Sequence, residues 1–407
     1  MNDEATVDTP EQAEFRAYCR EWLSNNKPGP PLPPEKRRSK TVPGRTSQEM
    51  QDYQLAWQKS AYEGGLVGCD YPKEYGGGGR TDCQRVANQE MQRIGVPEFP
   101  GPAALSHGAP TLLVHGSEFI KKRFIPKMLS GEEQWCQGFS EPNAGSDVAN
   151  QETFAEKRGD SWVVNGQKIW TSEAHWADWI LLVTRTDRSH KHKGITYFVA
   201  PMKENLGKTV EVRPLVQITG EAHFNEVFFT DLTIPDEYRV DEVGKGWSVV
   251  MTELKYERGA GDFVQPLGGG YPASDKPGSA PVETPIVGLA KRTTRLGKAA
   301  ADDPVVRDRI MQILIRRAGF EQANRRGQVK GLLDHPMRIA MQHKLVSSEL
   351  YQDLAALSAD IAGAPSTLSG SSAAGYISSL GGTILAGTSE IQRNQLGERI
   401  LGMPKTK

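Results

Sequence analysis

The hydrophobic and polar positions of this chain follow three successive patterns. Over the first third, apolar residues recur at helical spacing. The clearest set is Phe15, Tyr18, Cys19 and Trp22. Between about residues 135 and 235 the pattern changes to short runs rich in β-branched and aromatic residues, such as SWVVNG, WILLVTR, GITYFVA and HFNEVFF. Helical spacing returns after Gly246. The chain is therefore predicted to form helices, then an antiparallel sheet or small barrel, then helices again.

Capping signals locate the ends of two helices. Thr9 is the predicted N-cap of the first helix, with Pro10 at the first helical position and Gln12 reaching back to complete a capping box. A later helix is predicted to follow Asp303 and Pro304, because one apolar face begins there. That face consists of Val306, Ile310, Ile313 and Leu314.

Turn-rich segments separate these elements. KPGPPLPPEKRRSK is predicted to be an exposed loop, YPKEYGGGG an irregular segment, and the Gly/Pro-rich residues 261–285 non-helical. RSHKHKG contains two histidines, but between two strands it is predicted to be a solvated hairpin turn rather than a metal site.

Composition excludes several classes of protein. The 407 residues are 37% hydrophobic and 24% charged, as in ordinary globular proteins, and a net charge of −1 argues against nucleic acid or an anionic membrane as main partner. Four scattered cysteines form no metal-binding or disulfide pattern. There is no apolar run of the ~20 residues that cross a bilayer, and the N-terminal segment is polar and acidic. We expect a cytoplasmic protein without a metal site.

Two segments carry the candidate chemistry, while the common nucleotide-binding and hydrolase motifs are absent. WCQGFSEPNAGSDV, residues 135–148, predicts a tight backbone whose N–H groups and hydroxyls suit an anion or the polar edge of a heterocycle. In GQKIWTSEAHWADW, a strand ends at Trp170 beside two hydroxyl residues. Stacking of Trp170 on a planar cofactor and packing of Trp170 in the core both fit this pattern.

In this order and spacing, the two segments resemble the acyl-CoA dehydrogenase family. Further segments share the resemblance: YPKEYGGGG, FNEVFFTDLTIP, GKGWSVVMTELKYERG and GTSEIQRNQLGERILGMP. It covers nearly all of the chain except about residues 262–302 and the region before Gly381. The implied fold is mainly α with a central β domain. Its parts are an N-terminal helical domain (1–134), a flavin-binding β-barrel or sheet domain (135–245) and a C-terminal four-helix bundle (246–407).

The resemblance also implies which residues bind FAD. Phe139 and Ser140 are expected at the isoalloxazine ring, with Trp170 beside it and Ser172 near N5. Ser146 is expected at the acyl-CoA substrate or the neighbouring cofactor. The complete set of expected flavin contacts is Gln137, Phe139, Ser140, Gly145, Ser146, Trp170, Thr171, Ser172, Thr388 and Glu390. The last two are expected near the phosphates and adenosine.

The catalytic base is predicted at Glu257. Many family members carry a glutamate directly before the C-terminal GTS motif, where this chain has Ala386. Glu257 continues the apolar stripe of Val250 and Leu254, and its place before Arg258 resembles the base position of isovaleryl- and long-chain-type members. Arg258 would help to hold the CoA ester.

The competing carboxylates are Glu253, expected nearer the polar edge of that helix, and Glu390. The helical pattern alone favours a simple helix-end ion pair of Glu257 with Lys255 or Arg258, and the resemblance to the family is what assigns Glu257 as the base.

The implied reaction is FAD-dependent α,β-dehydrogenation of an acyl-CoA thioester, with electrons passed to electron-transferring flavoprotein. Family members bind the FAD pyrophosphate through Arg-x-x-Phe-Gly and Gln-x-x-Gly-Gly segments of a neighbouring subunit. The corresponding KRTTRLGKAAADDP and SADIAGAPS do not match. The hypothesis is therefore that this chain contributes the isoalloxazine half of the site and the base, while a second such subunit supplies the phosphate half in an α2β2 heterotetramer, as in actinobacterial steroid side-chain dehydrogenases. A homo-oligomer (dimer or tetramer) is the other option.

Alternatives are a flavin oxidase or monooxygenase of the same fold, and a non-catalytic or half-site subunit. Residues 265–281 are expected to shape the acyl pocket or an oligomer contact. The acyl group itself is not determined.

Overall fold

The computed structural model describes residues 8–101, 103–257, 285–295, 297–327, 338–368 and 372–405. These residues belong to two compact units, one ending at Glu257 and one formed by the described residues from 285 onward. Arg258 and residues 261–284, including the Gly/Pro-rich stretch, lie outside the described residues. No helix among the described residues is long and apolar enough to cross a membrane.

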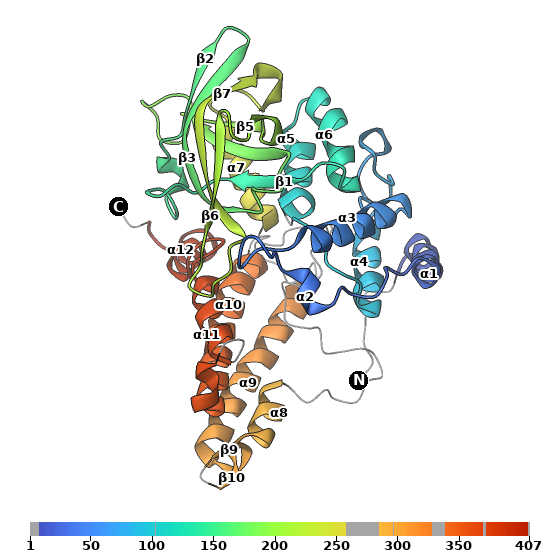
Figure 1. Cartoon of the computed structure of the whole chain (residues 1–407), viewed down its shortest axis with the longest axis vertical. Helices are drawn as coiled ribbons and strands as arrows, with labels where there is room; N and C mark the ends of the chain where they lie inside the picture. The colour runs from blue at the N-terminus through green and yellow to red at the C-terminus, as the bar shows by residue number, and fades with distance from the viewer. Residues whose placement is uncertain are drawn as a thin grey trace. The chain divides into compact units, whose positions relative to one another are not determined.

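The first unit begins with helices, as predicted (Figure 1). They are α1 (Pro10–Asn25), α2 (Pro34–Arg37), α3 (Gln48–Glu63), α4 (Cys83–Ile94), α5 (Ala109–His115) and α6 (Glu118–Ser130). The capping box is confirmed, because the Gln12 N–H donates to Thr9 Oγ1 at 3.2 Å and the Thr9 N–H donates to Gln12 Oε1 at 3.0 Å. Phe15 and Cys19 are buried, whereas Tyr18 is 45% exposed.

Two segments expected to be irregular contain short helices. α2 lies inside the proline-rich loop, where Pro34 occupies a first-turn position that suits its fixed φ and missing N–H. The segment at residues 71–79 contains the 3₁₀ helix Lys73–Tyr75, which ends at Gly76 with a φ of 82°. Only a residue without Cβ adopts that φ readily, so glycine ends the turn there.

The centre of the first unit is an eight-stranded, largely antiparallel sheet. Its strands are β1 (Trp135–Gly138), β2 (Phe154–Arg158), β3 (Ser161–Ser172), β4 (Trp179–Arg185), β5 (Ile195–Pro201), β6 (Val210–Leu215), β7 (Phe224–Pro235) and β8 (Arg239–Val240). The strand order is β6-β7-β3-β2-β4-β5-β8, and β1 pairs with β4 in parallel. The predicted turn at residues 188–194 joins the antiparallel strands β4 and β5.

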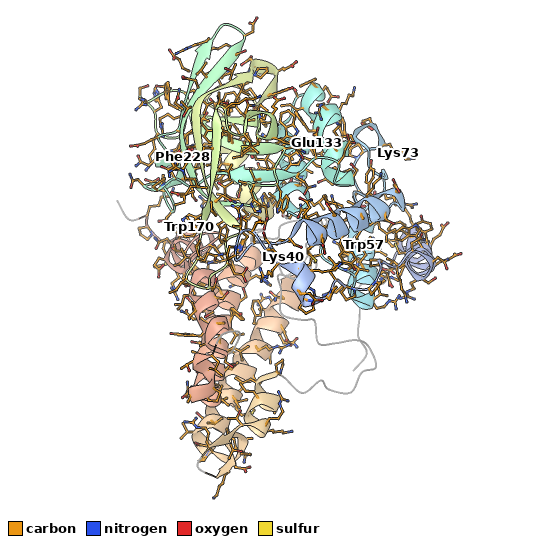
Figure 2. The ribbon with its side chains drawn as sticks, in the orientation of Figure 1. Lys40, Trp57, Lys73, Glu133, Trp170 and Phe228 are labelled. Carbon is orange, nitrogen blue, oxygen red and sulfur yellow. The ribbon has the colours of Figure 1, made fainter. Side chains whose placement is uncertain are left out.

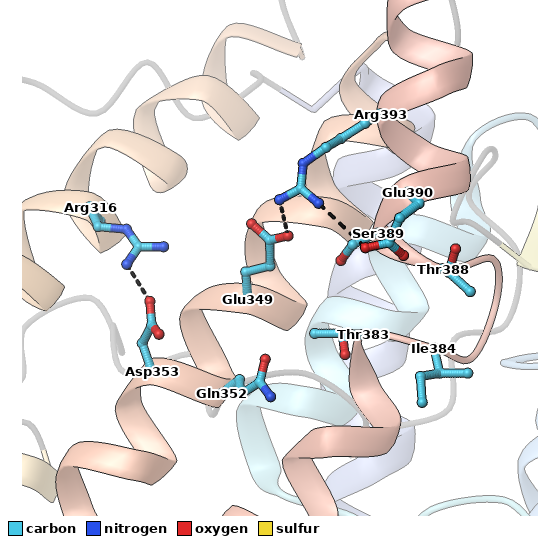
Figure 3. Close-up of a pocket in the computed structure, with 10 residues that line it drawn as sticks. All are labelled: Arg316, Glu349, Gln352, Asp353, Thr383, Ile384, Thr388, Ser389, Glu390 and Arg393. Atoms are coloured by element: carbon cyan, nitrogen blue, oxygen red, sulfur yellow. Dashed lines mark hydrogen bonds and ion pairs between the residues drawn. The ribbon is translucent and has the colours of Figure 1, made fainter. Parts of the chain in front are cut away.

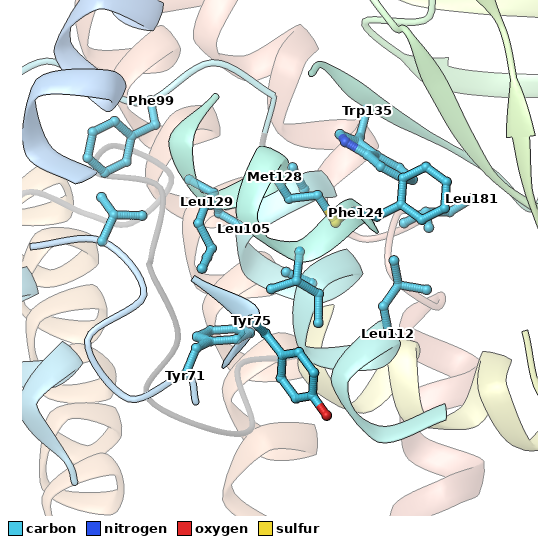
Figure 4. Packing of buried hydrophobic residues seen from close by; sticks show 14 of the residues in the cluster. Tyr71, Tyr75, Phe99, Leu105, Leu112, Phe124, Met128, Leu129, Trp135 and Leu181 are labelled. Carbon is cyan, nitrogen blue, oxygen red and sulfur yellow. The ribbon is translucent and has the colours of Figure 1, made fainter. Parts of the chain in front are cut away.

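Aromatic residues join the helices to the sheet in the core of this unit (Figure 4). The ring of Phe124 on α6 lies edge-on to Trp135 of β1 and to Trp179 of β4, with centroid distances of 5.4 and 4.9 Å. Leu112 of α5 and Leu181 of β4 are fully buried in the same cluster. This packing fixes the start of β1, and with it the loop that follows β1.

Helix α7 (Gly246–Glu257) packs on β5, on α5 and on the π-helix Ala103–Gly108, and therefore belongs to the first unit. Its buried face differs from the predicted stripe. Val249, Val250 and Glu253 are buried, whereas Leu254 and Glu257 are half-buried. The expectation that Glu253 lies near the polar edge is thus wrong, because it follows Val249 by four residues and Val250 by three and shares their face.

The second unit is helical apart from the two short strands β9 (Thr294–Arg295) and β10 (Lys298–Ala299). Its helices are α8 (Pro285–Arg292), α9 (Pro304–Gly327), α10 (Arg338–Ala362), α11 (Ser372–Gly382) and α12 (Ser389–Gln395). α10 packs against the other four helices. The predicted apolar face of α9 is confirmed: Val306, Ile310 and Ile313 are buried, and Leu314 packs against them.

Candidate functional site

A buried ion pair supports the loop that follows β1. Lys168 of β3 is fully buried, and its ammonium group donates to Glu141 Oε1 at 2.8 Å, to Gln151 Oε1 at 2.6 Å and to the carbonyl of Phe139 at 3.1 Å. Burial lowers the pKa of Lys168 to about 8, and Glu141 opposes this shift. The lysine is therefore largely charged at neutral pH, and it holds the backbone of the loop at Phe139.

Glu141 completes this support. Its carboxylate accepts the backbone N–H groups of Glu152 at 2.6 Å and Thr153 at 3.0 Å. Burial tends to raise its pKa, but Lys168 and the backbone donors lower the pKa below the ordinary value. Main-chain hydrogen bonds between Glu141 and Ala144 close the tight turn that the sequence predicts.

The expected flavin contacts in this loop differ in exposure. Phe139 is buried, Gln137 and Ser140 are half-buried, and Gly145 and Ser146 are exposed. The carbonyl of Ser140 accepts the N–H of Ile169 at 2.9 Å, which ties the loop to β3. One side of the loop is thus fixed to the sheet, and its Gly145–Ser146 end remains accessible.

The end of β3 presents an aromatic face and hydroxyl groups. Trp170 is 52% exposed and has a φ of 60°, a strained value for a residue with a side chain. Its ring lies edge-on to Phe224 of β7 at 5.7 Å, and Figure 2 labels Trp170 on this part of the sheet. The alternative of core packing is therefore wrong for Trp170. Thr171 is buried with no hydrogen-bond partner for its hydroxyl among the described residues, and Ser172 is half-buried.

Next to these residues lies a polar cluster that the sequence analysis did not identify. Glu173 Oε2 is 3.6 Å from His175 Nε2, and neither atom has a hydrogen bond within the described parts of the chain. Burial raises the pKa of Glu173 to about 7, against the effect of Arg45. Burial and Arg45 lower the pKa of His175 to about 4. Arg45 itself donates to Asn225 Oδ1 at 2.6 Å. The sequence offers no clear signal for this cluster, because Arg45 and Asn225 are far from Glu173 along the chain.

Two carboxylates on α7 have different environments. Glu257, at the last residue of α7, is half-buried. Glu253 is fully buried, accepts hydrogen bonds from the amide of Gln137 at 3.1 Å and from the hydroxyl of Tyr197, and lies 3.8 Å from His107 Nε2. Burial raises the pKa of Glu253 to about 8. Burial therefore favours the neutral carboxylic acid form of Glu253.

The second unit contains a polar hollow of about 510 Å³ lined by both expected contacts there, Thr388 and Glu390 (Figure 3). Thr388 caps α12 by accepting the Ile391 N–H at 3.2 Å. The two arginines of the lining are paired. Arg316 contacts Asp353, and Arg393 contacts Glu349 and, at 3.9 Å, Glu390. Three carboxylates thus face two guanidinium groups in the lining, leaving no surplus positive charge.

Ala386, at the family's other position for the base, lies in the same unit. Its φ is 52°, and its carbonyl accepts the side-chain amide of Gln392 at 3.1 Å. A methyl group cannot accept a proton, so this position contributes no base.

The described residues fit one half of an FAD molecule better than the other. An exposed indole face, a buried hydroxyl without a partner and an anchored loop suit the planar isoalloxazine ring. The hollow in the second unit does not suit a pyrophosphate by itself, because its arginines are already neutralised. Among the described residues there is no group of three or more metal-ligating side chains.

Comparison with known protein families gives three consecutive matches. Residues 9–132 match "Acyl-CoA dehydrogenase, N-terminal domain", residues 136–232 match "Acyl-CoA dehydrogenase, middle domain", and residues 284–401 match "Acyl-CoA dehydrogenase, C-terminal domain". Together they cover most of the chain.

Individual relatives extend this similarity over almost the full length. The chain is 35% identical to acyl-CoA dehydrogenase IpdE1 of Mycolicibacterium smegmatis, over 97% of this chain and 98% of the relative. Among solved structures, it is similar to the ChsE4-ChsE5 complex from Mycobacterium tuberculosis, with a TM-score of 0.72, 26% identity and full coverage of both chains. The Tcur3481-Tcur3483 steroid ACAD matches with a TM-score of 0.68 and 25% identity over 98% of this chain and 99% of that one.

Proposed function

Because the chain belongs to the acyl-CoA dehydrogenase family, we propose that it catalyses the FAD-dependent α,β-dehydrogenation of an acyl-CoA thioester with Glu257 as the base. The observation that carries this assignment is the contrast between the two carboxylates of α7. Glu253 is sealed in the core and occupied by hydrogen bonds, whereas Glu257 is partly accessible at the end of the helix. Ala386 removes the alternative base position.

The reaction requires a base for the weakly acidic α-proton of the thioester. FAD, when bound, supplies the acceptor for the hydride that leaves the β-carbon. Glu257 takes the α-proton from its half-buried position at the end of α7. Trp170 offers its exposed face beside the ring, and the loop held by Lys168 offers its hydroxyls and N–H groups. Electrons then pass to electron-transferring flavoprotein.

The phosphate half of the cofactor is proposed to come from a second, different subunit in an α2β2 heterotetramer. Three features support this arrangement. The arginines in the hollow of the second unit are neutralised by carboxylates. The chain lacks the family's two pyrophosphate-binding segments. Finally, one structurally similar protein is described as the ChsE4-ChsE5 complex, and another carries the paired name Tcur3481-Tcur3483.

The substrate class is best identified with a panel of CoA esters. One structural relative is described as a steroid ACAD, so a CoA ester carrying a steroid side chain is the first candidate. Short, branched and long acyl-CoA esters complete the panel, and bleaching of the flavin absorbance reports reduction. An ester with a steroid side chain is expected to reduce the flavin fastest.

Glu257→Gln tests the base. The amide keeps the size of the side chain but cannot accept the proton, so turnover should fall by about 10²–10⁴-fold while flavin and ligand binding persist. Glu242→Gln, which changes an exposed acid just before α7, is the matched control and should keep wild-type turnover. Undiminished turnover of Glu257→Gln would remove Glu257 from the mechanism.

Two other outcomes would change the reaction class. Rapid reaction of the reduced flavin with oxygen would indicate an oxidase or monooxygenase. A complex whose activity survives every substitution at Glu257 would make this chain a non-catalytic subunit, as Ala386 and the neutralised hollow would then suggest.

A further inference from the structure

Glu253 is the most deeply buried carboxylate of α7, and its contacts come from three other elements. The amide of Gln137 on β1 donates to its Oε1 at 3.1 Å, and the hydroxyl of Tyr197 on β5 donates to its Oε2. His107, in the π-helix Ala103–Gly108, places Nε2 3.8 Å from Oε1. One side chain thus connects the base helix to two strands of the sheet and to an irregular helix of a kind often found at functional sites.

Within the part of the chain that the structure describes, the neighbours of Glu253 do not include a permanent cation. Burial lowers the pKa of His107 to about 4, so this imidazole is neutral at pH 7. An ionised carboxylate in such a site would be buried without a counter-charge, which is strongly unfavourable. A protonated carboxyl group avoids this cost and still accepts both hydrogen bonds.

His107 is the nearest imidazole to Glu253, but it is not hydrogen-bonded to it. The Nδ1 atom of His107 lies 2.9 Å from the hydroxyl of Ser106, whereas its Nε2 has no hydrogen bond within the described residues. The 3.8 Å between Nε2 and Oε1 is too long for a hydrogen bond, so His107 is a buried neutral neighbour of Glu253 and not a partner that would stabilise its charge.

Glu257 follows Glu253 by four residues and lies next to it on the helix surface. Its charge further raises the pKa of Glu253, after the larger effect of burial. When the environments of two neighbouring carboxyls differ in this way, the accessible one ionises first and the buried one keeps its proton. The negative charge of the pair therefore resides on Glu257.

We propose that Glu253 is a positioning residue for the dehydrogenation, held in its protonated form. It fixes the amide of Gln137, an expected flavin contact, against the base helix, and it leaves Glu257 as the ionised member of the pair. This role rests on the proposed function of Glu257, because Glu253 itself does not touch the reacting atoms.

The titratable groups around Glu253 determine how its charge depends on pH. They are His107 from the π-helix, Tyr197 from β5 and Glu257 from α7 itself. From α5, His115 bonds to the adjacent Thr252 and faces Asp241. Burial raises the pKa of Tyr197 well above its ordinary value, so this phenol stays neutral and Glu253 is the first of the contacting groups to change charge above pH 7.

Thermal unfolding of the flavin-loaded full chain, in its complex if one is required, tests this role without substrate. Between the ordinary carboxyl pKa of 4.5 and about 8, the native state binds a proton that the unfolded state has lost, so wild-type stability should fall as pH rises. Glu253→Gln cannot ionise, and its unfolding midpoint should fall less over pH 5–9. Glu242→Gln is the control and should keep the wild-type pH dependence. Equal slopes for wild type and Glu253→Gln would overturn the proposal.

Activity separates a positioning role from a purely structural one. Glu253→Leu leaves Gln137 and Tyr197 without their acceptor, and kcat should fall by about tenfold or more with little change in KM. Glu253→Gln should retain a larger share of kcat than Glu253→Leu. It should also lose the alkaline decline in kcat that ionisation of Glu253 causes in the wild type.

If both variants kept wild-type kcat and its pH profile, Glu253 would be a packing residue only. If instead Glu257 were not the base, Glu257→Gln would keep full turnover, while the difference in pH-dependent unfolding between wild type and Glu253→Gln would remain.

Discussion

At the scale of single residues, the loop after β1 is supported by two buried charged side chains, Lys168 and Glu141, that bond to each other and to neighbouring polar groups. Lys168 bonds to a carboxylate, an amide oxygen and a backbone carbonyl. Its partner Glu141 also accepts two backbone N–H groups. Removing one partner of a buried ion pair leaves the other charge buried without compensation, which is strongly destabilising.

Lys168→Met should therefore lower the free energy of unfolding by about 3 kcal/mol, because Glu141 keeps its charge in the core without its counter-ion. Lys191→Met is the matched control. Lys191 pairs with Asp147 of the same loop region at 2.7 Å, but both side chains are about half exposed, and the loss should be under about 1 kcal/mol. Urea unfolding of both variants measures the difference, and equal losses would contradict this interpretation.

At the scale of elements, α7 is held in place by a polar bridge as well as by packing. His115, the last residue of α5, bonds through Nδ1 to Asp241 at 2.9 Å and through Nε2 to Thr252 of α7 at 2.8 Å. Thr252 directly precedes Glu253. The bridge thus fixes both the approach to α7 and the helix itself, on which the proposed base lies one turn further on.

Thr252→Val removes one end of this bridge without changing the shape of the side chain. We expect the free energy of unfolding to fall by about 1–2 kcal/mol, since a hydrogen bond is lost and the imidazole nitrogen loses its partner. Thr230→Val on the exposed face of β7 is the control and should change stability by less than about 0.5 kcal/mol. Chemical denaturation of both variants measures the two losses of unfolding free energy. Equal losses for Thr252→Val and Thr230→Val would show that the bridge does not contribute to stability.

The sequence predicted those features that depend on residues close together along the chain. The capping box at Thr9 involves residues three positions apart, and the apolar face of α9 repeats within one helix, so both could be identified from the sequence. The buried face of α7 could not. Its position depends on β5, α5 and the π-helix, which are far away along the chain.

At the scale of the whole molecule, the proposed cofactor site is incomplete in the described residues. The first unit, taken by itself, has an exposed aromatic face and an anchored loop, and the second unit has a hollow whose arginines are paired with carboxylates. In the proposed heterotetramer, the second subunit would supply the phosphate-binding segments that this chain lacks.

Purification of this chain alone tests the proposed assembly. We expect weak and substoichiometric retention of flavin, measured by absorbance per chain, and full retention only on co-expression with a partner that supplies the phosphate-binding segments. Light scattering during size-exclusion chromatography gives the composition of each species. A homo-oligomer with one flavin per chain would exclude the heteromeric arrangement.

The sequence by itself determined the succession of helical, β and helical segments, the loop and hydroxyl chemistry around Trp170, and the lack of a carboxylate at Ala386. These properties depend on spacing and residue type. Only the tertiary structure decided that Glu253 is sealed against Gln137 and Tyr197, that Arg45 lies close enough to act on the pKa values of Glu173 and His175, and that Arg316 of the hollow is paired with Asp353. Burial and charge pairing bring together residues that are distant along the chain, so no local pattern in the sequence could specify them.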